Sequence, residues 1–307
     1  MRVGLSWDLD TAGSAVQNVG RILAEAATAG RLGYDSAWVR ESRDGPGACP
    51  HPGLVLTALA RKDKTLQLRT VREVKQANPV RLAEEIAVLD VFSRGRAGLA
   101  FAAAGRQGEP PARVHETAEF VRAAWARDEF RFRGEHVRFP AHTPDDAPAG
   151  ASEPARRGCT PQWEWGPVMP DFLAVTPKPH APRPPLYVEI DDPGTLEWAA
   201  AHGVSPFVAA TVATEDAVER LCRYREAARA AGRGPAETEV VCERVITTDG
   251  GGESDADRFG GDAASVVAAI KDFATRTGMR HLVWQRKGSG DADLFRFAVD
   301  VYPLLQT

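Results

Sequence analysis

The sequence lacks the residue patterns that mark metal sites, disulfide frameworks and membrane segments. Its four cysteines include no CxxC pair, and its seven histidines show no HxH or HxxxH spacing, which argues against a zinc site. No apolar run approaches the ~20 residues of a membrane span, and the opening MRVGLSWDLD carries two acids, unlike a signal peptide. The net charge of −4 gives no electrostatic basis for binding nucleic acid or an anionic membrane. We therefore expect a soluble cytoplasmic protein whose ligand is a small molecule.

Strand-like and helix-like segments alternate along most of the chain. The stretch from Asn78 to Gly105 shows one unit: Asn78 and Pro79 open a helix, apolar residues at three- and four-residue spacing continue it, and the small or apolar residues 97–104 follow as a buried strand. The expected strands are 3–7, 34–39, 66–74, 97–104, 186–190, 206–210, 239–247 and 281–285.

Eight strands, each followed by a helix, predict an α/β fold with a single TIM (β/α)8 barrel over residues 1–307. A doubly wound sheet is the alternative, but no GxGxxG follows the first strand. The Pro-rich segment 140–170 interrupts the alternation before the fifth strand and is longer than an ordinary connection. We expect an insertion that is a lid or disordered, and Trp163 and Trp165 favour packing of its second half.

Polar residues follow several strands at the end where a barrel of this kind has its active site. Charged groups at buried strand ends are costly unless they are paired or functional. The residues that we expect to carry acid–base chemistry are Glu41, Arg72, Glu73 and Glu189. The residues that we expect to line a substrate pocket are Trp7, Asp8, Ser42, His51, Arg244 and Gln285.

Four stretches resemble the bacterial luciferase-like family of flavin and deazaflavin oxidoreductases. The first begins at Asn78 and reads N-P-x-R-x-A-E-E-x-x-x-L-D-x-x-S-x-G-R. Residues 32–41 are similar to the family's second strand, 130–139 to its short hairpin, and 177–188 to the approach to its fifth strand. The resemblance implies a TIM barrel, FMN or the deazaflavin coenzyme F420 as cofactor, and a homodimer. The apolar stripe of helix 80–92 places the dimer contact there and on helix 52–61.

The resemblance also implies two places that hold the flavin phosphate. One is the start of the helix after strand five, where Asp192 stands at the position of a small hydroxyl residue and is followed by Gly194 and Thr195. The other follows strand four, where Ala103 replaces an arginine of luciferase and Arg106 stands three residues further on. A carboxylate at a helix start satisfies the N–H groups there and repels a phosphate. We therefore expect weak FMN binding or none.

Three hypotheses for function follow from these observations. The first is a luciferase-like oxidoreductase or monooxygenase that uses reduced flavin or deazaflavin on a specialised small organic substrate, as in secondary metabolism. The second is a lyase, hydrolase or isomerase on the same barrel that has lost the cofactor and works by acid–base chemistry. The third is a non-catalytic subunit that pairs with an active relative. Ser42 stands where many relatives have histidine, which indicates a modified pocket under each hypothesis.

Overall fold

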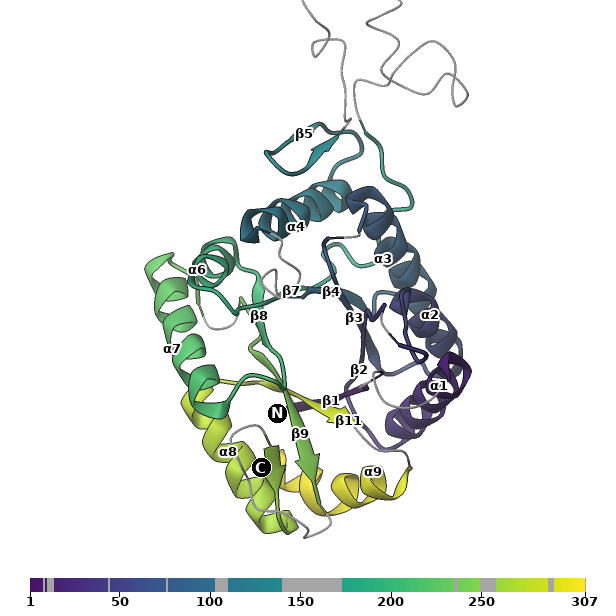
Figure 1. The fold of residues 1–307 in the computed structure, drawn as a ribbon, viewed down its shortest axis with the longest axis vertical. Helices are drawn as coiled ribbons and strands as arrows, with labels where there is room; N and C mark the ends of the chain where they lie inside the picture. Colours follow the sequence, from purple (N-terminus) through teal and green to yellow (C-terminus); the bar gives the residue numbers. More distant parts are fainter. Residues whose placement is uncertain are drawn as a thin grey trace, which may run out of the picture.

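The computed structural model describes residues 1–7, 9, 14–43, 45–75, 77–102, 110–139, 173–234, 237–248, 258–286 and 290–306. Eight parallel strands close into a barrel surrounded by helices (Figure 1). The strands are β1 (Arg2–Trp7), β2 (Ser36–Arg40), β3 (Gln67–Arg72), β4 (Ala97–Phe101), β7 (Leu186–Glu189), β8 (Ser205–Val208), β9 (Val241–Thr247) and β11 (His281–Arg286). Pairing of β1 with β11 and of β8 with β9 closes the ring, which confirms the predicted TIM barrel.

The helices form the outer layer, and side-chain caps mark where several of them begin. The helical segments are α1 (Ala15–Arg31), α2 (Pro52–Lys62), α3 (Pro79–Ser93), α4 (Pro111–Ala126), α6 (Pro193–His202), α7 (Thr214–Ala230), α8 (Ala263–Thr277), α9 (Ala292–Arg296), the π-helix η3 (Phe297–Val301) and α10 (Tyr302–Leu305). Ser14 forms a capping box at α1, and Asn78 accepts from the Val80 N–H at α3. Such caps stabilise a helix by about 1 kcal/mol each.

A few elements differ from the sequence-based expectation. The helix that closes the chain after the eighth strand begins at Ala292 and contains a π-helical stretch before Pro303. Proline has no N–H to donate within a helix. A short strand, β10 (Arg258–Gly260), pairs with β9 outside the barrel. The hairpin expected at 130–139 is present as β5 (Phe132–Arg133) and β6 (Arg138–Phe139). The insertion expected at 140–170 lies outside the described residues.

Strand alternation divides the core into a layer under the helices and a smaller cluster inside the barrel. The interior cluster is Trp38, Val71, Ala100, Ala102, Tyr187, Phe207, Val241 and Val283. Trp38 stacks on Phe207 with ring centroids 5.3 Å apart. Because successive side chains of a strand point to opposite faces, this cluster identifies which residues further along each strand enter the barrel.

A buried polar network closes the lower end of the interior, where the strands begin. The Nε2 atom of His281 lies 2.8 Å from the Ser36 hydroxyl, and its Nδ1 atom lies 2.9 Å from Glu239. Burial lowers the pKa of His281. Burial also raises the pKa of Glu239, but the contacts with His281, Arg2 and Tyr187 together outweigh it and lower that pKa to about 2. Ser36 is 1% exposed and also accepts from the Trp38 indole, so this serine–histidine–carboxylate row is structural.

The outer surfaces of α2 and α3 carry apolar side chains that the barrel does not cover. Leu54 on α2 is 70% exposed, and Val91 and Phe92 on α3 are 45% and 60% exposed. The two helices lie side by side (Figure 1), and the α2 backbone at Gly53 faces the Glu85 side chain of α3.

Among the described residues, every helix is too short or too polar to span a bilayer.

We expect this surface to join two copies of the chain. A Leu54→Asp, Phe92→Asp double variant should be monomeric in sedimentation at micromolar concentration, where the wild type should be a dimer, because two charges would have to be buried in the contact. Val299→Asp is the matched control, since Val299 is 70% exposed on η3, away from these helices. A monomeric wild type, or dissociation of the Val299→Asp variant as well, would contradict the expectation.

Candidate active site

An arginine held between two glutamates lies inside the upper end of the barrel. The alternation that turns Trp38 inward also turns Arg40 inward, two residues further along β2. Its guanidinium lies 2.5 Å from the Oε1 atom of Glu189 and 3.9 Å from the Oε2 atom of Glu243. Burial lowers the pKa of Arg40, but the two carboxylates outweigh that effect and raise it. Arg40 therefore stays a cation.

Glu243 is fixed in place by hydrogen bonds from two other strand ends. The hydroxyl of Ser6 on β1 donates to its Oε1 atom at 2.6 Å. The N–H of Ala210, just after β8, donates to its Oε2 atom at 3.2 Å. Each carboxylate oxygen has a donor, so the anion is stabilised as well as oriented. We call this upper end of the barrel, where the strands end, the mouth. Its cluster joins residues of β1, β2, β7 and β9 and a backbone N–H that follows β8.

Further carboxylates make this mouth acidic. Glu73 comes just after β3, and its charge raises the pKa of Arg40. Asp191 follows β7 two residues after Glu189, and its Oδ1 atom is buried with no hydrogen-bond partner among the described residues. Burial raises the pKa of Asp191, and the nearby charges of Glu189 and Asp192 raise it further. A carboxyl with a raised pKa and one oxygen without a hydrogen-bond donor is a candidate for proton exchange with a ligand.

Two of the expected acid–base residues lie on the other side of the barrel wall. Glu41 and Arg72 form an ion pair at 3.0 Å, and Arg72 reaches the carboxylate of Glu85 on α3 at 2.9 Å. Arg43 also contacts Glu41, at 2.5 Å. The pair links β2 and β3 to the helix layer. Glu73 and Glu189, the other two expected residues, belong to the mouth.

The residues expected to line the pocket also divide between the helix layer and the barrel interior. Trp7 points to the helix layer and donates its indole N–H to Glu25 at 2.9 Å, and Arg244 packs over the Phe273 ring of α8 at 4.8 Å. His51 is exposed, and the Ser42 N–H donates to the Cys49 carbonyl. Gln285 pairs with Ser6 in the strand register, on the interior side. Asp8, Ala103 and Arg106 lie outside the described residues.

No role was expected of four residues of the mouth, Ser6, Arg40, Asp191 and Glu243, although Arg40 and Asp191 stand at expected strand ends. Each of them stands next to a residue that was expected: Ser6 beside Trp7, Arg40 beside Glu41, Asp191 beside Asp192 and Glu243 beside Arg244. The available signal was the two-residue alternation counted upward from the large interior residues Trp38 and Tyr187. In the described part of the chain, no group of His, Cys, Asp and Glu side chains is arranged to hold a metal ion.

The start of α6 is occupied by the chain's own side chains. Asp192 caps the helix, and its Oδ1 atom accepts from the Thr195 N–H at 2.8 Å. The Thr195 hydroxyl lies 3.1 Å from the Nε2 atom of His115, whose ring stacks on Trp198 at 4.4 Å. Burial lowers the pKa of His115, which keeps the imidazole neutral at pH 7. The described residues at this helix start therefore do not fit a phosphate dianion.

Comparisons with known proteins agree on one family. A model of the family described as luciferase-like monooxygenase matches residues 1–259. The uncharacterized protein y4wF of Sinorhizobium fredii is 26% identical over 218 residues, which are 66% of this chain and 54% of that protein. The chain thus spans about half the length of this curated relative.

Solved structures share the fold along almost the whole chain. The monooxygenase RslO1 of Streptomyces bottropensis is 24% identical, with a TM-score of 0.77 and 99% of both chains covered. A 3,6-diketocamphane monooxygenase of Pseudomonas putida, solved with FMN, is 16% identical, with a TM-score of 0.70 and 99% and 98% covered. The coenzyme F420-dependent tetrahydromethanopterin reductase of Methanopyrus kandleri is 15% identical, with a TM-score of 0.71 and 99% of both chains covered.

The helix cap generates a prediction about phosphorylated flavins. Replacing Asp192 with serine should tighten FMN binding about 100-fold, because like charges ~4 Å apart repel by several kcal/mol at the dielectric of a protein surface. Riboflavin, which has no phosphate, should bind both proteins equally. Titration by flavin fluorescence measures both constants.

Asp262→Ser is the matched control for that titration. Asp262 caps α8 with the same geometry, its Oδ1 atom 2.8 Å from the Ser265 N–H. Its replacement therefore removes an equivalent cap without touching α6. Tight FMN binding by the wild type, or an equal gain in the Asp262→Ser variant, would contradict a phosphate clash at Asp192.

Proposed function

The chain belongs to the luciferase-like monooxygenase family, and from this premise we propose that it is an oxidoreductase that uses a reduced flavin or deazaflavin to convert a specialised small organic substrate at the barrel mouth. The observation that carries the proposal is the Arg40 cluster, because it places a permanent cation and several carboxylates at the strand ends where barrels of this kind react. The cofactor supplies the redox chemistry when bound.

The chain's own residues bind and orient the substrate in this proposal. Arg40 donates to an oxygen of the substrate, and its charge stabilises negative charge that develops there. Glu189 and Glu243 hold the guanidinium in one orientation. Asp191, with its raised pKa and free oxygen, holds or releases the proton at the substrate. The excess of carboxylates favours a neutral or cationic substrate.

A cofactor-free enzyme is the second candidate, and the start of α6 favours it. Asp192 occupies the place that the family resemblance gives to a phosphate. Asp191, whose pKa is raised by burial and by the charges of Glu189 and Asp192, then stands two residues from Glu189, which pairs with Arg40. Such a pair can act as base and acid in a lyase, hydrolase or isomerase.

Binding of the bare flavin ring separates the two candidates. We expect riboflavin and 5-deazariboflavin to bind the wild type with quenched fluorescence. Arg40→Met should weaken binding about tenfold, because the mouth loses its cation and a charge-assisted hydrogen bond from that cation to the bound ring. Arg223→Met is the control, since Arg223 is exposed on α7. Circular dichroism checks that each variant is folded.

The outcomes of this titration are distinct. Ring binding that depends on Arg40 supports the oxidoreductase. If neither ring binds the folded wild type, the cofactor-free enzyme becomes the better account of the mouth. If both rings bind but Arg40→Met and the control behave alike, the flavin lies elsewhere and the assignment of the mouth is wrong.

A further inference from the structure

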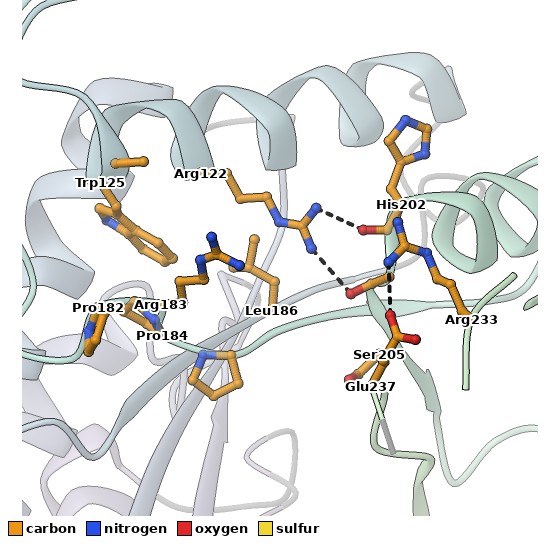
Figure 2. A pocket seen from close by; sticks show the side chains of 13 residues that line it. Arg122, Trp125, Pro182, Arg183, Pro184, Leu186, His202, Ser205, Arg233 and Glu237 are labelled. Atoms are coloured by element: carbon orange, nitrogen blue, oxygen red, sulfur yellow. Dashed lines mark hydrogen bonds and ion pairs between the residues drawn. The ribbon is translucent and has the colours of Figure 1, made fainter. Parts of the chain in front are cut away.

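A cavity lies on the face of the barrel opposite the mouth. It has a volume of about 700 Å³ and reaches Leu186 and Ser205, the first residues of β7 and β8. The end of α4, the end of α6 and the segment after α7 form its other walls. Figure 2 shows three arginine side chains in it, with Trp125 on one side and Glu237 on the other.

Two of the three arginines close the end of α6. Arg122 donates to the carbonyls of His202 and Gly203 at 2.9 and 3.2 Å. Arg233 donates to the carbonyl of Ala201 at 2.9 Å and to Glu237 at 3.2 Å. These contacts satisfy carbonyls that a helix end leaves without partners. They account for the presence of two guanidiniums, and for the one carboxylate among the lining residues.

Arg183 is the third arginine of the cavity, and its charge is not used in closing α6. It is exposed in the segment that leads into β7, and no described residue forms a hydrogen bond or ion pair with its guanidinium. Burial lowers the pKa of Arg122, and the positive charges of Arg233 and Arg183 lower it further, so Arg122 is repelled by both of the other guanidiniums. An anion between them would relieve that repulsion.

The wall beside the arginines is apolar. It consists of the Trp125 ring, Ala126 and the run Pro184–Pro185–Leu186. Trp125 is held in place because its indole N–H donates to the Ala83 carbonyl at 3.0 Å. A cavity of this size with an apolar wall and a few placed charges has the character of a small-molecule site.

We propose that this cavity binds a small organic anion, a carboxylate on a flat apolar body, with the carboxylate between Arg183 and Arg122 and the apolar body against Trp125 and the prolines. Guanidinium groups match the planar geometry of a carboxylate. The site is separate from the mouth, and it does not depend on the proposed oxidoreductase activity.

Calorimetric titration of the full chain with benzoate and with acetate tests both parts of the proposal. The two probes carry the same charge and differ in the ring, so benzoate should bind about tenfold more tightly. Arg183→Gln should weaken benzoate binding at least about fivefold, since one charge-assisted contact is lost. Glu237→Gln should tighten it about threefold, because the competing carboxylate becomes neutral. Arg223 is exposed on α7, outside this cavity. The Arg223→Gln variant should therefore bind benzoate as tightly as the wild type.

Arg183→Gln should weaken benzoate binding and Glu237→Gln should tighten it. A general loss of stability would weaken binding in both variants, so the two explanations are distinguishable. Benzoate binding that is unchanged by both substitutions would place the anion elsewhere and overturn the site. Absence of benzoate binding up to about 50 mM, a range that includes weak ligands, would overturn it as well. Equal binding of acetate and benzoate would overturn the assignment of an apolar-bodied ligand.

Discussion

The ion pair between Arg40 and Glu189 is the contact on which the barrel mouth depends. Below it the interior is filled by Trp38 and Phe207, so a charge at this level has little water and needs a partner. Glu189 is 3% exposed and contacts the Arg40 guanidinium directly. Glu243 accepts hydrogen bonds from Ser6 and Ala210. The ion pair therefore fixes the position of the Arg40 guanidinium before a ligand binds.

The start of α6 shows how a shared barrel can hold a changed site. Family membership gives the barrel and its open end, but the detailed chemistry follows from individual side chains. Asp192 supplies from within the chain the negative charge that a phosphate would bring to a helix start. At the other end of the same helix, Arg122 supplies positive charge to the carbonyls. Both ends of α6 are thus neutralised by the protein itself.

The sequence predicted the barrel well because caps and hydrophobic periodicity act locally. Asn78 began α3 as expected, and the eight strands appeared in the expected order. The mouth was predicted less well because a shift of one residue along a strand moves a side chain across the barrel wall. Glu41 was expected inside but pairs with Arg72 under the helices. Arg40, the preceding residue, points inward. Such neighbours are told apart by counting the alternation from a residue that lies inside the barrel, such as Trp38.

A double-mutant cycle on the mouth ion pair tests the central claim most directly. Denaturant unfolding would give the free energy of unfolding for the wild type, Arg40→Met, Glu189→Gln and the double variant. We expect each single substitution to cost about 2–3 kcal/mol, since it removes the nearest opposite charge of its partner inside the barrel, and the double variant to cost about 2 kcal/mol less than the sum. Additive costs within about 0.5 kcal/mol would show that Arg40 and Glu189 do not depend on each other, and would contradict the account of the mouth.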